Sequence, residues 1–268
     1  MNSTRRFIAP LVMVVLVLAY LLPIGCMGLL SILPVKAISG GFSLSFSFEI
    51  FRSLLFERGF TRFLYNSTVI SVLSVFLTLA LSVPAAYASV RWKARKAFIG
   101  FVAASRCIPQ FTLMISLYLA YLRVGLQDTH LGLIFVYTFL NIPLAFLLMR
   151  RYFELFDPDV EEAALCDGSS RAYVFFTIVL PLMKKGLLVA AVVCFVMSWN
   201  ELPFALILTD FRAVTATKSL LYLLYSSRGV AVEQLEDIQF LGAAAILQLI
   251  PTVLLVGIIQ RLFTRLFS

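Results

Sequence analysis

Residues 66–90 read NSTVISVLSVFLTLALSVPAAYASV, and the basic cluster Arg91, Lys93, Arg95 and Lys96 follows at once. A helix of about 20 apolar residues is long enough to cross the ~30 Å hydrocarbon core of a bilayer. This stretch has that length, carries no charged residue and is closed by positive side chains. It is therefore predicted to be a transmembrane helix.

The composition of the whole chain extends this prediction. Of the 268 residues, 61% are apolar and 13% are charged, and the mean hydropathy is +0.98. A soluble globular domain has about 45–50% apolar and about 25% charged residues. These values exclude a cytosolic enzyme, a secreted domain and a disordered chain. The predicted class is an all-α integral membrane protein.

Six apolar runs of this kind occur, and we predict a single transmembrane domain over residues 1–268. The predicted spans cover residues 7–33, 66–90, 97–122, 131–149, 187–209 and 240–260. The first run is longer than the about 7–15 apolar residues of a signal peptide, so it is predicted to remain as a span.

The positions of the basic residues predict the orientation of the chain. Lys and Arg residues lie against the span ends at the N-terminus, in the 91–96 and 150–186 loops and in the C-terminal tail. By the positive-inside rule, both termini and these two loops are predicted to face the cytoplasm. The net charge of +8 is explained in the same way.

Several other functions lack their residue patterns. No run rich in Lys and Arg with interleaved aromatic residues indicates a nucleic-acid partner. The four cysteines form no CxxC pair, and His130 is the single histidine. We therefore predict no metal site, no cofactor and no catalytic residues. His130, next to Asp128, is predicted to be a solvated loop residue, with a contact to an external protein as the alternative.

The 150–186 loop has the pattern of a folded element. Asp157 and Pro158 form a helix start, because Asp is a favoured N-cap and Pro is favoured at the first helical position. The helix dipole favours the acidic residues that follow in the first turns, namely Asp159, Glu161 and Glu162. A short helix is predicted to begin here.

Gly168 is predicted to end this helix, because glycine adopts the left-handed conformation without penalty. Ser169 or Ser170 can cap a second short helix that runs to about Ile178, and Pro181 then interrupts the chain before the fifth span. The loop is thus predicted to be helix–Gly–helix. Its small residues allow it to dock into a cleft on another protein, or it packs under its own bundle; these residues alone leave both open.

A resemblance decides between these alternatives. The residues Glu162-Ala163-Ala164, Gly168, Ile178, Leu180 and Pro181 follow the pattern E-A-A-x3-G-x9-I-x-L-P. This pattern resembles the EAA motif of the membrane subunits of binding-protein-dependent ABC importers. The resemblance implies that the loop inserts as a coupling helix into a partner ATPase. The implied coupling residues are Glu162, Ala163, Ala164, Asp167, Gly168, Ile178, Leu180 and Pro181.

Further short motifs are similar to those of the carbohydrate-uptake permeases, the class that contains the inner-membrane subunits of the maltose transporter. They are Asn66-Ser67, Ile108-Pro109, Ile142-Pro143, Trp199-Asn200-Glu201 and Gln260-Arg261. The resemblance implies a multi-pass protein of a bacterial or archaeal cytoplasmic membrane that imports a sugar or sugar-like solute. It implies a second homologous permease, two ATPase subunits and an extracytoplasmic solute-binding protein as partners. The chain lacks the phosphate-binding pattern G-x-x-x-x-G-K-[ST], so ATP is expected to bind to the partners.

Polar residues within the predicted spans are the candidates for a substrate pathway, because such residues are costly in a bilayer and face a bundle or a cavity. They are Arg106, Asn141, Trp199, Asn200 and Glu201. Trp can stack on a sugar ring, and Asn and Glu can bind hydroxyl groups. The alternatives are a structural anchor for Arg106, a contact between the two permeases for the Trp199–Glu201 segment, and a helix–helix hydrogen bond for Asn141.

Pro109 and Pro143 can kink their helices. Kinks near the midplane often mark binding sites in transporters, and they are also ordinary packing devices in membrane helices. A second function is left open by two charged residues of the spans. Arg106 and Glu201 could instead serve a proton or ion relay in a self-contained secondary transporter or channel. Such a transporter is expected to show internal repeats, and no repeat is evident in the sequence.

Overall fold

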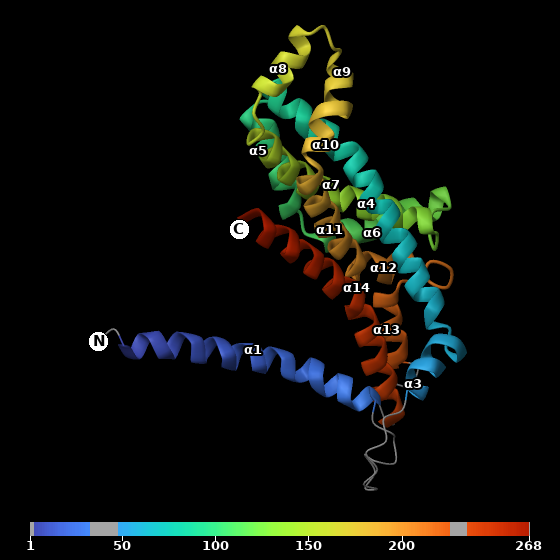
Figure 1. The fold of residues 1–268 in the computed structure, drawn as a ribbon. Helices are drawn as coiled ribbons and strands as arrows, with labels where there is room; N and C mark the ends of the chain where they lie inside the picture. The colour runs from blue at the N-terminus through green and yellow to red at the C-terminus, as the bar shows by residue number, and fades with distance from the viewer. Residues whose placement is uncertain (1–2, 33–47, 226–234, 268) are drawn as a thin grey trace. The chain divides into compact units, whose positions relative to one another are not determined.

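The computed structural model describes residues 3–32, 48–225 and 235–267, which form helices joined by short turns; no strand occurs in these ranges (Figure 1). The all-α prediction is confirmed for them. In chain order, the helices are α1 (Ser3–Ile32), α3 (Glu49–Arg52), η1 (Ser53–Glu57), α4 (Phe60–Arg91), α5 (Lys96–Ala104), η2 (Ser105–Cys107), α6 (Gln110–Val124), α7 (His130–Glu154), α8 (Asp159–Cys166), α9 (Arg171–Val174), η3 (Phe175–Val179), α10 (Leu180–Leu182), α11 (Lys184–Trp199), α12 (Pro203–Leu208), α13 (Ala216–Tyr225) and α14 (Leu235–Phe267).

Four helical stretches are long and apolar enough to cross a bilayer by themselves: Val12–Ile32, Phe60–Arg91, His130–Glu154 and Asp237–Ile258. Two further candidates are bent pairs of helices, Lys96–Cys107 with Gln110–Val124 and Arg171–Leu182 with Lys184–Trp199, which bend by 84° and 75°. The described residues thus contain four candidate spans, or six when each bent pair counts as one. Five of the six predicted runs correspond to these segments, and the third of them is bent. The fifth run, 187–209, shares only residues 187–199 with the second bent pair, and the 75° bend of that pair lies before the run, within the predicted 150–186 loop.

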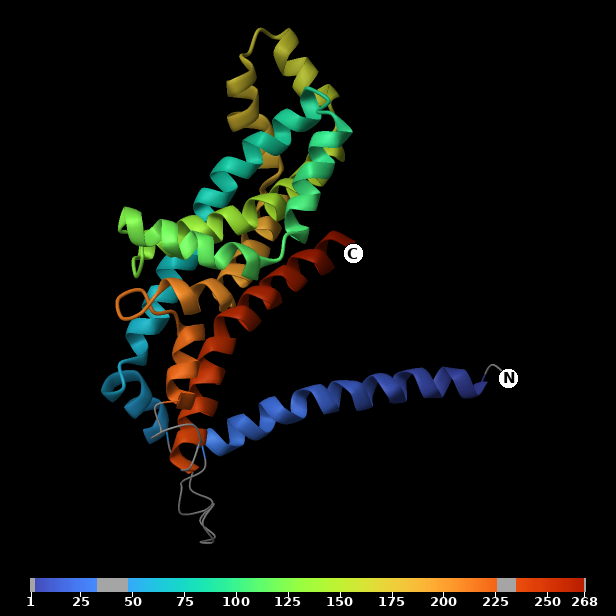
Figure 2. The same cartoon turned by 180° about the vertical axis from the view of Figure 1, so that it is seen from behind.

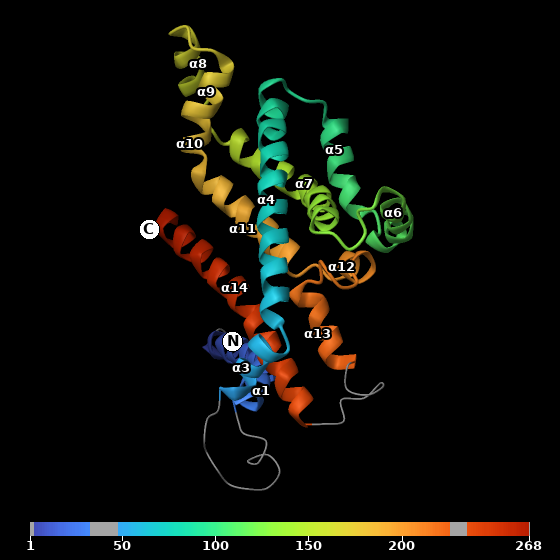
Figure 3. The same cartoon turned by 90° about the vertical axis from the view of Figure 1, so that its right-hand side faces the viewer.

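The third predicted span, residues 97–122, is broken at Ile108 and Pro109, between α5 and α6 (Figure 3). A residue before proline is pushed out of the helical region, and Ile108 is extended, with φ −67° and ψ 123°. The fifth predicted span, residues 187–209, is broken after Trp199, because Pro203 cannot continue the ladder of α11. Continuity of these two spans was therefore predicted wrongly.

The described residues group into two compact units. One contains Met1–Arg62 and Ser219–Pro251, and the other contains Phe63–Lys218 and Thr252–Ser268. The predicted functional residues all lie in the second unit.

Helix α4 organises the second unit through a stripe of small polar side chains on its buried face. The stripe recurs at helical spacing and consists of Ser67, Ser71, Ser74, Thr78, Ser82 and Ser89. Small residues of this kind let helices approach closely in a bilayer. The hydroxyl of Ser74 lies 3.1 Å from that of Ser198 on α11, and Thr138 on α7 donates to the Ser74 carbonyl at 3.3 Å.

Helices α7 and α11 pack closely where α11 begins. A Cβ atom at Gly186 would lie 2.7 Å from the ring of Tyr152, so only glycine allows this approach. The aliphatic and aromatic core of this end of the unit includes Phe146, Phe153 and Phe175.

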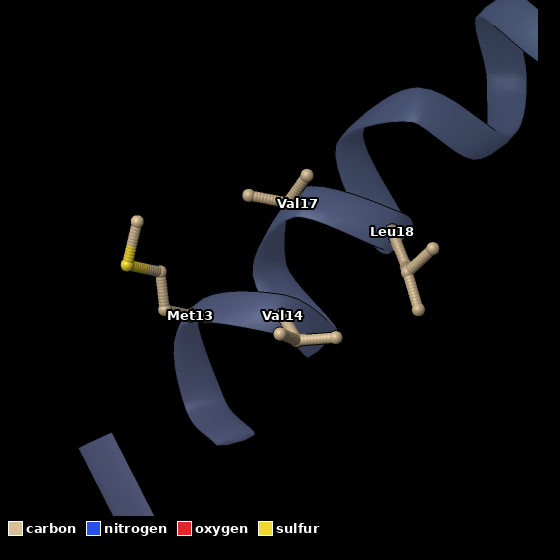
Figure 4. Close-up of a pocket in the computed structure, with 4 residues that line it drawn as sticks. All are labelled: Met13, Val14, Val17 and Leu18. Carbon is tan, nitrogen blue, oxygen red and sulfur yellow. The ribbon is translucent and has the colours of Figure 1, made fainter. Parts of the chain in front are cut away.

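In the first unit, α1 and α14 meet at the C-terminal end of α1. Gln239 donates from Nε2 to the Leu30 carbonyl at 3.0 Å, and a Cβ atom at Gly242 would lie 2.9 Å from the Met27 carbonyl oxygen. Residues 12–23 of α1 are exposed. Figure 4 shows four of the side chains that project from this stretch: Met13, Val14, Val17 and Leu18.

Candidate functional site

The segment α8–α10 has the predicted helix–Gly–helix structure (Figure 1). Asp157 Oδ1 accepts a hydrogen bond from the Asp159 N–H at 3.1 Å, which caps the start of α8. Gly168 follows α8 with φ +87°, in the left-handed region that favours glycine. Of the two serines predicted as caps, it is Ser170 whose hydroxyl accepts from the Tyr173 N–H, at 3.2 Å.

The second helix is longer than predicted. From Ser170 onward, α9, η3 and α10 follow one another without a turn, and the 75° bend comes after Leu182 rather than near Ile178. Pro181 lies within α10, immediately before this bend. The chain was predicted to be interrupted at Pro181, and the bend lies next to it, after Leu182. The second helix of the loop runs up to this bend instead of ending near Ile178.

The predicted coupling residues separate into two groups. Glu162, Ala163, Asp167 and Gly168 are exposed and follow the outer face of α8 and its end, whereas Ala164 is half-buried. Ile178 and Leu180 are half-buried and pack against the core cluster that contains Phe153 and Phe175, while Pro181 is exposed. The motif therefore supplies an exposed face and residues that hold it on the bundle.

Glu161 was predicted only as an acidic residue in the first turns of the helix, and it was not among the predicted coupling residues. It is 5% exposed, and its carboxylate meets helix α4. Arg91 Nε lies 2.9 Å from both oxygens, and Arg91 Nη2 also donates to Oε1. The Tyr87 hydroxyl donates to Oε2 at 2.8 Å. The sequence did contain an indication of this burial. Glu161 lies four residues before the apolar Leu165, so both side chains lie on the same face of α8.

The candidate pathway residue Asn141 forms a helix–helix contact with Ser198, which was not among the candidates. Asn141 is buried on α7 and donates from Nδ2 to the Ser198 hydroxyl on α11 at 2.8 Å, and to the Cys194 carbonyl at 3.4 Å. Arg106 lies in the break between α5 and α6, and its Nη1 donates to the carbonyl of Leu140 at 3.0 Å. Asn141 is thus part of the packed interior, whereas the Arg106 side chain is exposed and contacts the backbone of α7.

Trp199 and Asn200 end helix α11. The Trp199 side chain is 3% exposed and stacks on Phe195 with ring centroids 5.5 Å apart. Its indole ring is therefore packed within the chain and is not presented for sugar stacking. Asn200 is exposed, and its Nδ2 donates to the Val196 carbonyl at 2.9 Å, which satisfies a carbonyl at the end of α11.

Glu201 and Lys218 hold the two ends of the short helix α12. The Glu201 carboxylate accepts from the N–H groups of Phe204 at 2.9 Å and Ala205 at 3.2 Å. The ammonium group of Lys218 donates to the carbonyls of Leu206 at 3.1 Å and of Thr209. A negative group at the N-terminus and a positive group at the C-terminus complement the helix dipole. Both side chains serve local structure here.

The turn between α6 and α7 is joined to residues 208–213 through Asp128. Its carboxylate accepts from four backbone N–H groups, those of Asp210, Phe211, Arg212 and Ala213, at 2.9–3.2 Å. Partial burial raises the pKa of Asp128, but these four donors outweigh that effect and hold the pKa below its usual value. The carboxylate form is thus the one that this junction stabilises.

The N-terminal part of α4 joins the same region. Asn66 donates from Nδ2 to the carbonyls of Arg212 at 3.0 Å and Val214 at 2.9 Å. His130 Nε2 lies 2.9 Å from Asn66 Oδ1, and His130 is half-buried. The prediction of a solvated histidine is therefore wrong, because its position at the start of α7 brings it against α4.

Comparisons with known proteins identify the family of this chain. Residues 78–268 match the family described as binding-protein-dependent transport system inner membrane component. The chain is 35% identical over 212 residues to a probable ABC transporter permease protein, y4oR, of Sinorhizobium fredii, covering 79% of this chain and 74% of that protein.

It is also 30% identical over 252 residues to the trehalose transport system permease protein SugB of Mycobacterium tuberculosis, covering 92% of this chain and 90% of that protein. A crystal structure of a bacterial ABC transporter involved in alginate import has the same fold, with a TM-score of 0.81 at 23% identity. The match covers 97% of this chain and 98% of the solved chain.

Proposed function

The chain belongs to the family of binding-protein-dependent transport system inner membrane components, and from this we propose its role within the transporter. It is a permease subunit of an ABC importer that carries a sugar or sugar-like solute into the cell. It is not itself catalytic, because ATP hydrolysis belongs to separate subunits.

The observation that carries this proposal is the exposed face of α8. Glu162 and Ala163 point away from the bundle, and Gly168 ends the helix with its own surface open. Small side chains beside a carboxylate suit insertion into a groove with a basic rim, since they allow close approach of two backbones. We assign this face to contact with an ATPase subunit on the cytoplasmic side of the membrane.

The same loop is built to resist compression against such a partner. Its two short helices are capped by Asp157 and Ser170, and Ile178 and Leu180 anchor it on the core. A rigid projection can transmit force, whereas a loose tether cannot. The proposed coupling residues are those named in the motif, together with the anchoring residues beneath it.

A sugar is proposed as the solute because of the relatives. SugB, which aligns with almost the whole chain, is described as a trehalose transport permease. The partners proposed with it are a second homologous permease, two ATPase subunits and an extracytoplasmic solute-binding protein. We place the complex in the cytoplasmic membrane, with both termini and the α8–α10 loop inside.

The polar residues of the spans are proposed to shape the pathway rather than to bind the sugar directly. Asn141 is engaged with α11, Trp199 is packed on Phe195, and Glu201 caps α12. A relay that uses Arg106 and Glu201 in a self-contained transporter is not favoured, because Glu201 is committed to backbone N–H groups and because the relatives are ABC permeases.

A co-purification from membranes tests the proposal. The tagged chain is extracted in mild detergent beside the Glu162→Ala/Gly168→Trp variant, and the bound proteins are identified by mass spectrometry. The wild type is expected to retain a second permease and an ATPase, and the variant is expected to lose the ATPase alone. A wild-type chain that purifies alone and stays folded would contradict the proposal.

The co-purified complex then gives the substrate class. ATP hydrolysis is measured in liposomes with the solute-binding protein and a panel of mono-, di- and oligosaccharides, polyols and glycerol phosphate. A sugar that stimulates hydrolysis and accumulates inside the liposomes identifies the solute. An ATPase subunit without its phosphate-loop lysine is the control, and it should show neither activity.

A further inference from the structure

The two neighbouring glutamates of α8 have different surroundings. Glu162 is exposed on the outer face, whereas Glu161 is buried against the last two turns of α4. Arg91 holds the Glu161 carboxylate through Nε at 2.9 Å to each oxygen and through Nη2, and Tyr87 adds a hydrogen bond at 2.8 Å. The planar guanidinium fixes direction as well as distance.

This ion pair is shielded from water. The side chains of Arg91 and Glu161 are 17% and 6% exposed. Removal of one partner from a buried pair leaves an uncompensated charge, so the two helices are held together firmly. Arg91 is the last residue of α4 and Glu161 lies in the first turn of α8, so each charge also complements the dipole of its own helix.

Aromatic packing also connects Tyr87, which binds Glu161, to helices α7 and η3. The Tyr87 ring lies 5.6 Å from that of Phe153 on α7 and 4.7 Å from that of Phe175 on η3. The Tyr87 hydroxyl can therefore remain on Glu161 only while α4, α7 and η3 keep their arrangement. Figure 2 shows the α8–α9 hairpin at this end of α4.

Helix α4 continues from this point as one uninterrupted helix of 32 residues, about 48 Å long at 1.5 Å per residue. Along it, Ser89 accepts from Arg150 of α7 at 2.8 Å and Ser74 lies 3.1 Å from Ser198 of α11. Near its other end, Asn66 binds the carbonyl of Arg212. A displacement of Glu161 thus has a continuous route of contacts along the unit.

We propose that Glu161, Arg91 and Tyr87 form a mechanical joint that transmits movement of the α8–α10 loop into helix α4. This inference rests on the proposed function, in which an ATPase moves that loop. Glu162 then meets the partner, and Glu161 passes the movement on. Glu161 and Arg91 are positioning residues, and neither touches the solute or ATP.

The test uses the complete importer, purified and reconstituted in liposomes. Solute uptake and ATP hydrolysis are both measured per amount of assembled complex. Glu161→Gln and Arg91→Met are each expected to lower the ratio of solute imported to ATP hydrolysed by about 2- to 30-fold, the size of change that coupling residues produce. The assembled complex is expected to keep hydrolysing ATP.

A double variant gives the rescue. Well-packed apolar residues of similar volume can replace a buried ion pair without loss of stability. Arg91→Met/Glu161→Met is therefore expected to restore the ratio toward the wild-type value, because α8 and α4 again pack as one body. A ratio that falls further in the double variant than in the single variants would overturn the joint.

Arg151→Gln is the matched control. Arg151 and Glu154 form an ion pair within α7 at 3.4 Å, and the Arg151 side chain is 71% exposed. This pair joins no second helix, so its loss is expected to leave the ratio unchanged. If Glu161→Gln prevents assembly, Tyr87→Phe supplies the readout: it keeps the ion pair, and an unchanged ratio would count against the joint.

Two failures can be told apart. A wild-type complex without ATP-driven uptake overturns the proposed function and the joint with it. A wild-type complex that transports, with variants that lose assembled complex, uptake and hydrolysis in the same proportion, leaves the proposed function intact. It shows that Glu161 has a structural role only.

Discussion

Two glutamates of the second unit are both held by hydrogen bonds, yet the bonds have different reach. Glu161 accepts from side chains that lie 70 and 74 residues away on α4. Glu201 accepts from backbone N–H groups three and four residues further along its own chain segment. The first carboxylate joins two helices, and the second shapes the start of one. A hydrogen-bonded carboxylate thus links the α8–α10 loop to α4 at Glu161, whereas at Glu201 it stabilises only the start of α12.

The largest expected effect is at the end of α8. Gly168→Trp places a bulky residue at φ +87° and on the proposed docking face, so uptake should be abolished while insertion into the membrane is retained. Uptake by whole cells and the amount of membrane-bound protein are measured together. Gly168→Asn should keep part of the uptake, because Asn tolerates the left-handed region.

The control for Gly168 is Gly100→Trp in α5. A Cβ atom at Gly100 meets nothing within 4 Å, and its backbone has no positive φ. Uptake by this variant is expected to be normal. Equal losses in the two tryptophan variants would mean that bulk, and not the loop, explains the effect.

The next effect concerns Asp128, which joins two connections through four backbone donors. Because its folded pKa is lowered, its contribution to stability is present above the unfolded value of about 3.9 and is lost as pH falls through the folded pKa. Asp128→Asn should cost about 1–2 kcal/mol near neutral pH, a charged hydrogen-bond contribution reduced for partial solvation. Thermal unfolding in detergent at several pH values measures it.

The pH dependence of stability tests the role of the Asp128 carboxylate. As pH falls from about 3.9 through the lowered folded pKa of Asp128, the wild type should lose more stability than Asp128→Asn, because the variant has already lost the carboxylate. Identical pH profiles of wild type and Asp128→Asn would remove Asp128 from this role.

A smaller effect is expected at Glu201. Glu201→Ala removes the acceptor for the Phe204 and Ala205 N–H groups and should cost about 1 kcal/mol, the typical value for a lost helix cap. The thermal midpoint should fall, and the solute concentration for half-maximal uptake should not change. A large change in that concentration at unaltered stability would instead indicate that Glu201 contacts the solute. Glu201 would then have more than a local structural role, contrary to the comparison with Glu161.

The smallest effect is at the contact of α7 and α11. Hydrogen bonds between membrane helices contribute about 0.6 kcal/mol on average. Asn141→Ala and Ser198→Ala should each lower stability by about that amount, and the double variant should lose less than the sum of the two because the two side chains share the hydrogen bond between Asn141 Nδ2 and the Ser198 hydroxyl. A double-mutant cycle from thermal unfolding measures the coupling, and strictly additive losses would contradict it.

The membrane class and the six apolar segments could be predicted because they depend on composition and run length. The breaks could not, since proline alone does not decide them. Pro109 and Pro203 lie at breaks, whereas Pro84, Pro143 and Pro251 lie inside α4, α7 and α14. Neighbouring helices can satisfy the backbone groups that a proline frees, and the local sequence does not contain that information.

The loop shows the same division. Asp157, Gly168 and Ser170 act on residues one to three positions away, and their roles followed from sequence. Glu161 depends on Arg91, and a partner 70 residues distant is invisible to local patterns. The assignment to the carbohydrate-uptake permeases rested on ordered motifs over most of the chain, and the family comparison confirms it.

The adjacency of Glu161 and Glu162 has an evolutionary consequence. Successive residues of a helix differ by about 100° in direction, so their side chains contact different parts of the complex. A change at Glu161 can be compensated by a second change at Arg91, in the same gene. A change at Glu162, on the exposed face, is compensated only in the gene of the protein that docks there. In related genomes, position 161 should therefore covary within the chain and position 162 between chains.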